Sequence, residues 1–562
     1  MRKYEANTIT PPAEVQQLAA EWLAQHEPVQ LEPAQEPLFI QFVQALGRAL
    51  PESGAGSSLS GAAYQRLMRT YAARGLPWLG KSDVLYLYAQ LCADGRLTYD
   101  PDFVTLLQKK PTRSQAGVTV VTVLTKPYPC PGECIFCPTD VRMPKSYLHD
   151  EPGAQRAERH GFDPYAQTAA RIQALEQIGH PVEKIELLIL GGTWSSYRRD
   201  YQEWFVQRCL DAMNGEDSAS LVEAQEKNAV GPRRNVGLVV ETRQDCITPD
   251  ELRWFRTLGV TKVQVGIQSL DERILAINKR GHDVQSTRDA FRLLRLAGFK
   301  IHGHWMANLL GATPASDRAD FARLWSDPAV RPDELKIYPC MLVENADLYA
   351  YWQRGEYEPY DEETLTQLLA DCLAQVPRYV RVNRVIRDFP TTNVVAGNKK
   401  ANLRQVATAR AEADGRALHD IRAREIRRQK VRREELQLRV TTYETDATTE
   451  HFLSFETADE RLAGFLRLSF PHPNQELPIP ELAGHAMIRE VHVYGPALNL
   501  GDDSEGEAQH MGLGSELINK AKEIARAAGF RQIAVISAIG TRAYYGRYHN
   551  FVMDGLYMTA VL

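Results

Sequence analysis

Long apolar runs are absent from this sequence, and cysteine is scarce. No stretch of 18 apolar residues occurs, and the opening run Met-Arg-Lys-Tyr-Glu-Ala-Asn-Thr contains no apolar signal core. Only 8 of the 562 residues are cysteine, and their uneven spacing excludes the disulfide framework of a small secreted protein. We therefore expect a cytoplasmic protein that does not enter a membrane.

A general excess of positive charge is also lacking, because the formal net charge is -5 at pH 7. This excludes a wholly basic nucleic-acid-binding protein. The exception is the run IRAREIRRQKVRR at residues 421–433, which holds seven Lys or Arg and one Glu. Such a run is typical of contact with a phosphate backbone, although a solvated helix face has the same composition. The candidate contacts are Arg427, Arg428, Arg432 and Arg433, with further basic side chains at Lys109, Lys110 and Arg113.

Three of the cysteines stand together in the run YPCPGECIFCP, at Cys130, Cys134 and Cys137. Three thiolates can hold three irons of a 4Fe-4S cluster and leave the fourth iron open, as a cluster that cleaves S-adenosylmethionine requires. A zinc site with His149 is an alternative, but His149 lacks the usual paired spacing. Buried structural thiols are a second alternative, which the prolines and the glycine of this loop disfavour.

The order of apolar patterns predicts an α/β protein of several domains. Residues 1–100 read as helical, whereas residues 101–395 alternate β-branched runs with amphipathic helices and include a polar insertion at 214–235. The six β-branched runs lie at residues 118–124, 185–190, 236–241, 261–267, 301–309 and 334–339. Six βα units predict a partial (β/α)6 barrel with its active site at the carboxyl ends of the strands. A basic linker at 396–437 then leads into an α+β domain at 438–562. Apolar and polar residues alternate in its β runs, which is typical of antiparallel strands.

Glycines and polar residues follow the predicted barrel strands. Gly191, Gly192 and Thr193 end the second strand, where glycines let the backbone approach the methionine end of S-adenosylmethionine. An ordinary βα turn is the alternative. Further polar groups lie at or near the ends of later strands, namely Glu241, Arg243, Gln264, Gln268 and Ser269. A polar side chain inside a barrel mouth is costly unless it binds something, so we expect contacts to cofactor or substrate rather than solvated loops.

The C-terminal domain carries the pattern Q-x-x-G-x-G between a strand and a helix, at Gln509, Gly512 and Gly514. Backbone N–H groups at such a helix start can hold a pyrophosphate, so the pattern predicts binding of an acyl-coenzyme A. Tyr544 and Tyr545 follow the next strand. There a phenol can act on the thioester, and aromatic packing is the alternative.

Together these features resemble one family, the catalytic subunit of Elongator. In that family a radical S-adenosylmethionine barrel is joined to a C-terminal GNAT acetyltransferase domain, and some members act without the other Elongator subunits. The resemblance covers residues from about 105 to 562. The segments that carry it are KKPTRSQAGVTVVTVLTKPYPCPGECIFCP, FDPYAQTAARIQALEQIGHPVEKIELLILGGTW, VVETR, NKRGH, RPDELKIYPC, EVHVYG, QHMGLG and RAYYGRY.

The resemblance implies a tRNA carboxymethyluridine synthase that needs S-adenosylmethionine, a 4Fe-4S cluster, acetyl-CoA and an electron donor. We expect a monomer or a homodimer, and the sequence does not distinguish the two. A 5'-deoxyadenosyl radical takes hydrogen from the acetyl methyl group, the carbon radical adds to C5 of the wobble uridine of tRNA, and the thioester is hydrolysed. Cys130, Cys134 and Cys137 take the positions of the cluster ligands, and Lys184 matches a lysine that contacts acetyl-CoA. The acetyl-CoA site falls on Glu490, Val491, His492, Val493, Gln509, His510, Met511, Gly512, Gly514 and Tyr545. We expect Tyr544, Tyr545 and Lys184 to serve the catalytic steps.

Two other functions fit part of the sequence: a protein lysine acetyltransferase with a structural or regulatory barrel, and an RNA-binding scaffold with vestigial cofactor sites. The sequence also departs from the family at ALHDIRAREIRR. Leu418, Asp420 and Ala423 stand there in place of zinc-binding cysteines, and only His419 is able to ligate. We therefore predict no structural zinc and expect packing or salt bridges to hold the linker. Residues 1–100 are a candidate tRNA-binding region without a specific motif.

Overall fold

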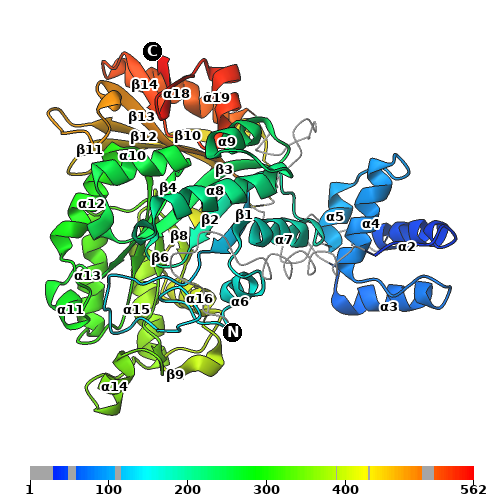
Figure 1. Cartoon of the computed structure of the whole chain (residues 1–562), viewed down its shortest axis with the longest axis horizontal. Helices are drawn as coiled ribbons and strands as arrows, with labels where there is room; N and C mark the ends of the chain where they lie inside the picture. Colours follow the sequence, from blue (N-terminus) through cyan, green and yellow to red (C-terminus); the bar gives the residue numbers. More distant parts are fainter. Residues whose placement is uncertain are drawn as a thin grey trace.

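The computed structural model describes residues 29–48, 59–107, 116–387, 389–427, 429, 431–495 and 512–562. Within these ranges the chain forms an N-terminal group of helices, a barrel of parallel strands, and a C-terminal domain built on a mixed sheet (Figure 1). The predicted fold class is therefore confirmed. No helix in the described ranges is long and apolar enough to cross a membrane.

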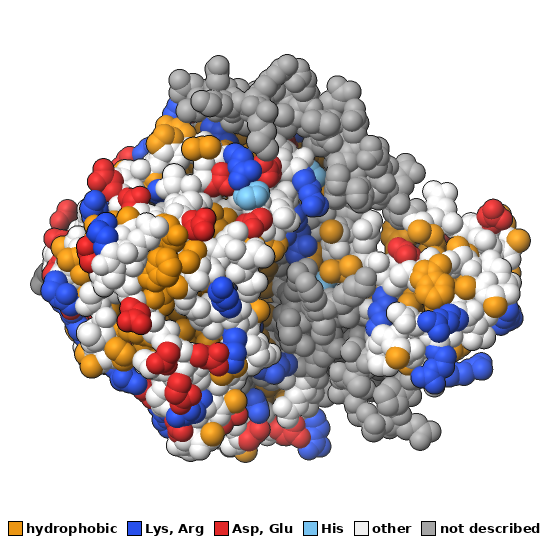
Figure 2. Space-filling model, turned by 90° about the horizontal axis from the view of Figure 1, so that it is seen from below, with side chains coloured by type: hydrophobic (Ala, Val, Ile, Leu, Met, Phe, Trp, Pro, Cys, Tyr) orange, Lys and Arg blue, Asp and Glu red, His pale blue; other side chains and the backbone are white. Residues whose placement is uncertain are grey.

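Four helices make up the N-terminal part: α2 (Glu36–Arg48), α3 (Gly61–Ala72), α4 (Lys81–Ala93) and α5 (Pro101–Leu107). They enclose a core of their own, in which Phe39, Phe42 and Met68 are fully buried. The group lies to one side of the barrel, and in Figure 2 it forms a separate lobe on the right with Lys and Arg side chains on the face in view. It touches the barrel at the turn after α7 (Pro164–Glu176), because a Cβ on Gly179 would lie 2.8 Å from Leu85.

The central part is a partial barrel of parallel strands in the order β1-β2-β3-β4-β5-β6-β8. The strands are β1 (Thr119–Leu124), β2 (Lys184–Leu190), β3 (Arg234–Thr242), β4 (Lys262–Gln268), β5 (Lys300–Trp305), β6 (Glu334–Ile337) and β8 (Arg381–Arg384). All six predicted runs form strands, and β8, which is short and polar, is a seventh that the sequence analysis missed. Because β1 and β8 are the two edge strands of this sheet, the barrel is open along one side.

Helices cover the outside of the barrel (Figure 1). They are α6 (Pro152–Arg159), α7, α8 (Arg199–Asn214), α9 (Leu221–Val230), α10 (Pro249–Leu258), α11 (Glu272–Ile277), α12 (Val284–Leu296), α13 (Pro314–Ser326), α15 (Glu362–Gln375) and α16 (Leu403–Ala413). The short helix α14 (Leu348–Gln353) lies instead beside a small ladder of β7 (Leu342–Val343) and β9 (Val394–Ala396). Local sequence sets their ends: α10 begins where the Thr248 hydroxyl accepts a hydrogen bond from the Glu251 N–H and ends at Gly259, whose φ is +90°. The polar segment at 214–235 is not a simple insertion, because it contains α9.

The C-terminal domain is a mixed sheet in the order β10-β11-β12-β13-β14-β16-β15. Its elements are β10 (Gln437–Glu444), β11 (Thr448–Glu456), β12 (Leu462–Pro471), β13 (His485–Val493), α18 (Leu513–Ala527), β14 (Gln532–Val535), α19 (Arg542–His549), β15 (Val552–Asp554) and β16 (Tyr557–Val561). The parallel ladder between β13 and β14 stops at Ile488 and Val535, whereas β13 continues to Val493. The two strands therefore diverge and leave a gap between them.

Ion pairs hold the linker that contains α17 (Ile421–Arg424). Asp420 is fully buried and lies 3.1 Å from Arg404, and the Arg424 guanidinium lies 3.0 Å from Glu456 of the C-terminal sheet. Glu425 lies 2.7 Å from Arg381 of β8. These contacts tie the linker to both the barrel and the C-terminal domain, as expected for a segment that packing or salt bridges stabilise.

Buried polar contacts also join the barrel directly to the C-terminal sheet. Arg489 of β13 donates to Asp333, just before β6, at 2.8 and 2.5 Å. Arg256 of α10 donates to the carbonyl oxygens of Ser537 and Leu556 at 3.2 and 2.9 Å. Because breaking one buried ion pair costs about 3–5 kcal/mol, these contacts hold the amino ends of the barrel strands firmly against β13.

Candidate active site

The cysteine loop follows β1 at the carboxyl ends of the barrel strands and borders a cavity of about 710 Å³. Cys130, Cys134 and Cys137 all line this cavity, which we call the cysteine cavity. Arg280 donates to the Cys134 sulfur at 3.4 Å, and the Cys130 sulfur lies 3.4 Å from the Thr193 hydroxyl. Burial raises the pKa of the Cys137 thiol to about 11, so this thiol stays protonated until a metal displaces its proton.

The three cysteines line one cavity, and three thiolates are the protein ligands of a 4Fe-4S cluster with one open iron. Among the described residues, no group of three or more Cys, His, Asp or Glu side chains is close enough to hold one metal ion. In a 4Fe-4S cluster each cysteine binds a different iron, so the sulfurs lie farther apart. His149 pairs with Asp140 at 3.3 Å instead of facing the cysteines as a zinc ligand. The loop therefore fits a 4Fe-4S cluster, with the Arg280 cation beside its thiolates.

The glycine turn after β2 borders the same cavity. Gly191 has a φ of +143°, and a Cβ at this position would lie 1.8 Å from the Thr125 hydroxyl oxygen. Gly192 has a φ of +90° and lines the cavity together with Thr193. Gly191 is therefore needed because Thr125 packs against it, whereas Gly192 and Thr193 present the turn to the cavity.

Polar side chains from later strands complete the wall of the cysteine cavity. Glu241 accepts a hydrogen bond from Tyr147 at 3.1 Å, and Arg243 forms an ion pair with Asp245 at 2.7 Å. Gln264 and Gln268 each have a buried amide atom without a hydrogen-bond partner among the described residues. Because such atoms are costly to bury, the two amides are placed to bind a ligand.

Ser269, which follows β4, does not take part in this wall. Its hydroxyl donates to Asp320 at 3.1 Å, and it does not line the cysteine cavity. The expected contact between Ser269 and a cofactor or substrate is therefore replaced by a structural hydrogen bond.

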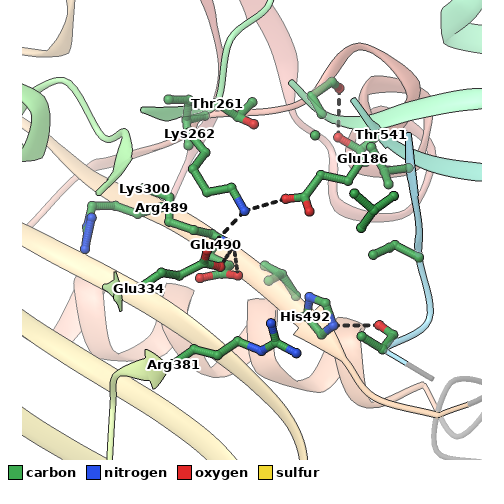
Figure 3. A pocket seen from close by; sticks show the side chains of 18 of the residues that line it. Glu186, Thr261, Lys262, Lys300, Glu334, Arg381, Arg489, Glu490, His492 and Thr541 are labelled. Carbon is green, nitrogen blue, oxygen red and sulfur yellow. Dashed lines mark hydrogen bonds and ion pairs between the residues drawn. The ribbon is translucent and has the colours of Figure 1, made fainter. Parts of the chain in front are cut away.

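A second cavity, of about 560 Å³, lies between the amino ends of the barrel strands and the C-terminal sheet (Figure 3). We call it the acyl cavity. It occupies the gap where β13 and β14 diverge, and Glu490, Val491, His492 and Tyr545 line it. The His492 imidazole forms a hydrogen bond with the carbonyl oxygen of Ala116 at 2.7 Å, so β13 is fixed to the residues just before β1. Beyond Ile488 the ladder with β14 ends, which leaves the backbone on this side of β13 without a partner strand and facing the cavity.

Other predicted coenzyme contacts lie beside this cavity rather than on its wall. Val493 lies next to the backbone of Gly514, and the Tyr544 hydroxyl lies 3.2 Å from the Ser515 hydroxyl. A Cβ on Gly514 would lie 3.2 Å from the Tyr544 hydroxyl, so this position favours glycine. Gly512, with a φ of +70°, caps the start of α18. The predicted contacts Gln509, His510 and Met511 lie outside the described residues.

A chain of ion pairs crosses the base of the barrel (Figure 3). Lys262 lies 2.6 Å from Glu186 and 3.1 Å from Glu334. Lys300 lies 3.1 Å from Glu334 and also contacts Glu490 of β13. Burial acts to raise the pKa of Glu334, but Lys262 and Lys300 outweigh it and hold that pKa well below its usual value. The Glu334 carboxylate therefore remains ionised.

The two cavities meet inside the barrel, in a space that we call the lumen. Both are bordered by the same residues at their junction: Val120, Thr122, Arg171, Glu186, Lys262, Arg381, Asn383 and Arg384. Most of these belong to the edge strands β1 and β8 or to the ion-pair chain. A molecule bound along β13 and a molecule bound at the cysteine loop would thus face one shared space.

Lys184 lies at the amino end of β2, at the end of the barrel that meets the C-terminal domain. Its β3 partner Arg234 packs against Gly540, next to the acyl cavity residue Thr541. Burial, followed by the charge of Arg234, lowers the pKa of Lys184. Lys184 itself lines neither cavity, so the structure places it beside the acyl cavity and not within it.

The predicted basic contacts are spread over the surface of the linker. Arg427 is exposed, Arg432 pairs with Glu435 at 2.9 Å, and Arg433 pairs with Glu516 at 2.6 Å. Exposed ion pairs of this kind contribute about 0–1 kcal/mol, so both arginines can exchange their partner for a phosphate. Lys109, Lys110, Arg113 and Arg428 lie outside the described residues.

The sequence analysis missed the charged residues of the lumen. A signal was present, because several buried strands carry polar residues two positions apart, as in Lys300, His302 and His304 of β5. Alternate residues of a strand point to the same side, so each such pair faces the inside of the barrel. Recognising this period would have predicted a charged lumen instead of an apolar one.

Comparison with known proteins agrees with this arrangement. Residues 128–322 match the radical SAM superfamily, and residues 332–414 match the Radical SAM C-terminal domain. The tRNA uridine(34) acetyltransferase of Methanocaldococcus infernus is 39% identical over 470 residues, which cover 81% of this chain and 88% of the relative. Elongator complex protein 3 of Homo sapiens is 35% identical over 474 residues, or 81% of this chain and 86% of that protein.

Solved structures give the same result. The archaeal Methanocaldococcus infernus Elp3 with an N-terminal deletion is 37% identical, with a TM-score of 0.70, and the match covers 80% of this chain and 100% of that chain. The shared fold therefore extends over the barrel and the C-terminal domain together. The chain belongs to the radical SAM family that comprises the tRNA uridine(34) acetyltransferases and Elongator complex protein 3.

Proposed function

We propose that this protein adds a carboxymethyl group to C5 of the wobble uridine of tRNA, with S-adenosylmethionine and acetyl-CoA as co-substrates. A 4Fe-4S cluster held by Cys130, Cys134 and Cys137 supplies, when bound, the electron that cleaves S-adenosylmethionine. Relatives that cover most of the chain bear the name tRNA uridine(34) acetyltransferase, which supports tRNA as the substrate. The observation that carries the proposal is the lumen, because it joins the cysteine cavity to the acyl cavity.

The protein's contribution is to position two co-substrates toward one enclosed space. In the cysteine cavity, the bare backbone at Gly192 and the amides of Gln264 and Gln268 would bind S-adenosylmethionine. In the acyl cavity, acetyl-CoA would lie along β13 with its acetyl end toward the lumen. Holding reactants in this way replaces a collision by an intramolecular approach, and the surrounding wall keeps water and other hydrogen donors away.

Tyr545 is the side chain best placed to act on the thioester. It lines the acyl cavity, and burial raises the pKa of its phenol, so the phenol stays protonated. A protonated phenol can donate a hydrogen bond to the thioester or to the departing thiolate. Tyr544, which is next to it, positions the start of α18 through Ser515. Lys184 would support the coenzyme from beside the cavity.

A protein lysine acetyltransferase is not favoured by this geometry. The acetyl group would lie at the end of the acyl cavity that opens into the lumen. Val118 and Val120 line this cavity, so an acceptor lysine would have to reach the acetyl group through the lumen. Glu490 is one of the carboxylates that line the cavity, but Lys300 and Arg467 bind it. Burial acts to raise the pKa of Glu490, but these cations dominate and lower it, which makes it a poor base for an amine.

The test is an anaerobic incubation of the reconstituted protein with reductant, S-adenosylmethionine, acetyl-CoA and unmodified tRNA, followed by mass spectrometry of the nucleosides. We expect carboxymethyluridine only when all components are present. Cys134→Ala should abolish the visible absorbance of the cluster and the modification, whereas Cys92→Ala, in the N-terminal helices, should change neither. Formation of 5'-deoxyadenosine without modified uridine would leave the radical site intact and refute the acceptor. Acetylated lysines without either product would favour the acetyltransferase.

A further inference from the structure

We propose that four side chains in the cysteine cavity recognise the Watson–Crick edge of the uracil base and reject cytosine. They are Glu241 of β3, Gln264 of β4, His304 of β5 and Lys336 of β6, and we call them the base-reading cluster. This inference rests on the proposed function and deepens it, because it names the residues that select the base of the acceptor nucleotide. The ligand chemistry is a ring with a carbonyl oxygen next to an N–H group.

The base-reading cluster lies between the sites of the two co-substrates. Gln264 and Lys336 follow Lys262 and Glu334 of the ion-pair chain by two residues, so their side chains also point into the barrel. Two residues of a strand span about 7 Å, which places the cluster nearer to the carboxyl ends of the strands. All four side chains line the cysteine cavity, and none lines the acyl cavity. A base bound here would therefore lie between the cysteine loop and the ion-pair chain.

Gln264 fixes which atoms of the cluster donate hydrogen bonds and which accept them. Its side-chain oxygen accepts from the Lys336 ammonium at 2.5 Å and lies 2.9 Å from Nε2 of His304. An ammonium group can only donate, so the Gln264 atom that faces it is the oxygen. Nε2 of His304 must then carry a hydrogen, which leaves Nδ1 as an acceptor in the neutral ring. Burial, followed by the charge of Lys336, lowers the pKa of His304 well below its usual value, so the ring is neutral.

Lys336 is the donor of the cluster. Its side chain is half-buried, and among the residues that the structure describes the Gln264 oxygen is its only hydrogen-bond acceptor. Within the same residues, no carboxylate lies within ion-pair distance of the ammonium. Two of its three hydrogens therefore remain for a ligand. A carbonyl oxygen in the cavity would accept a charge-assisted hydrogen bond from one of them.

His304 and Glu241 are the acceptors. Nδ1 of His304 lies 3.8 Å from Oε1 of Glu241, whereas the other oxygen of Glu241 accepts from Tyr147 at 3.1 Å. In the described part of the chain, neither Nδ1 nor Oε1 receives a hydrogen bond. Two acceptors that face each other without a hydrogen between them are unfavourable in a buried site. A ligand N–H group placed beside them would satisfy this need.

A donor beside two acceptors matches uracil and opposes cytosine. Uracil presents its 4-carbonyl oxygen, an acceptor, next to the N3–H donor, whereas cytosine presents a 4-amino donor next to an N3 acceptor. Uracil can therefore accept from Lys336 and donate to His304 or Glu241. Cytosine would set donor against donor and acceptor against acceptor. Because C4 is bonded to C5, a hydrogen bond to the 4-carbonyl oxygen also positions the carbon that is modified.

S-adenosylmethionine is the other ligand of this cavity, and its carboxylate is also able to bind a lysine. The expected partner of its methionine end is the open iron at the cysteine loop, beyond the carboxyl ends of the strands. Gln264, by contrast, lies four residues before the last residue of β4. Its amide nitrogen stays available to S-adenosylmethionine, while its oxygen aligns Lys336 and His304 toward the base.

The experiment measures the affinity of the full reconstituted chain for two unmodified tRNAs that differ only in uridine or cytidine at the wobble position. S-adenosylmethionine is present and reductant is omitted, so that no turnover occurs. A two-point contact to a base edge discriminates by about tenfold to a hundredfold, so the wild type should prefer the uridine tRNA at least about tenfold. Lys336→Met removes the donor and keeps the length of the side chain, and it should reduce this preference to less than about threefold.

The controls separate base recognition from folding and from cofactor binding. Lys227→Met, on α9 and paired with Glu223 at 3.1 Å, should keep the wild-type preference. The affinity of Lys336→Met for S-adenosylmethionine, measured by equilibrium dialysis, should equal that of the wild type. Thermal unfolding checks each fold, and Glu241→Gln, which replaces an acceptor oxygen by an N–H group, carries the test if Lys336→Met does not fold.

Three outcomes would overturn the base-reading cluster while leaving the proposed function intact. The first is a folded Lys336→Met variant that keeps the wild-type preference, and the second is a loss of its affinity for S-adenosylmethionine, which would assign the cation to that cofactor. The third is a wild-type chain that forms carboxymethyluridine yet binds the two tRNAs equally. A strong preference for uridine without any carboxymethyluridine would instead refute the proposed reaction and support the recognition of the base.

Discussion

Glu334 is the carboxylate at the centre of the ion-pair chain in the lumen, and its removal gives a quantitative test of that chain. Its oxygens lie 3.1 Å from both Lys262 and Lys300, and it accepts a hydrogen bond from Asn383 at 2.7 Å. Removing one partner of a buried ion pair costs about 3–5 kcal/mol. Because Glu186 and Glu490 still bind the two lysines, we expect Glu334→Gln to destabilise the protein by about 2–3 kcal/mol.

The pH dependence of this effect has a definite sign. Burial acts to raise the pKa of Glu334, but the lysines dominate and hold it well below the usual value of 4.5. A carboxyl group with a depressed pKa in the folded state contributes stability above its unfolded pKa and loses that contribution as the pH falls through the folded pKa. The difference in stability between wild type and Glu334→Gln should therefore stay constant from about pH 7 to about pH 5 and shrink only at lower pH.

Differential scanning calorimetry of the full chain is the assay. We expect the main transition of Glu334→Gln to fall by roughly 3–6 °C, since a given free-energy change moves the midpoint less in a large cooperative unit. Glu356→Gln is the matched control, because Glu356 pairs with Arg354 on the surface at 2.6 Å, and it should not move the transition. An unchanged midpoint for Glu334→Gln, or an equal drop in both variants, would refute the role assigned to the chain.

Three further predictions concern the turn, the linker and the metal content. Gly191→Ala should weaken binding of S-adenosylmethionine more than tenfold in equilibrium dialysis, because its Cβ would lie 1.8 Å from the Thr125 hydroxyl oxygen. Gly215→Ala should leave this binding unchanged, because nothing lies within 4 Å of its Cβ. Equal losses of affinity in the two variants would contradict the steric argument. Asp420→Ala should destabilise the protein by about 3 kcal/mol in thermal unfolding, because it leaves Arg404 without its buried partner. A variant as stable as the wild type would show that packing alone holds the linker. Metal analysis of anaerobically purified protein should find iron and no stoichiometric zinc, and one zinc per chain would contradict the substitution of ion pairs for a metal site.

Much of the architecture could be predicted from local patterns. The β-branched runs form the first six strands of the barrel, since their period and length are properties of the segments themselves. The cysteine loop and the glycine turn were found from composition and spacing, and both border the cysteine cavity. The strand β8 was missed because Arg381–Arg384 is short and polar, and it is a strand only through its pairing with β6.

The fold class, the cysteine trio and the resemblance to a family could be predicted from the chain alone, because each depends on residues that are close together in it. The folded structure was needed to show that the two cavities share one lumen and that an ion-pair chain from Lys262 to Glu490 crosses its base. It also turned Ser269 away from the cavity and placed Lys184 beside it. A side chain's partner, burial and charge balance depend on strands that lie far apart in the chain, and only the packing of the barrel on the C-terminal sheet brings these strands into contact.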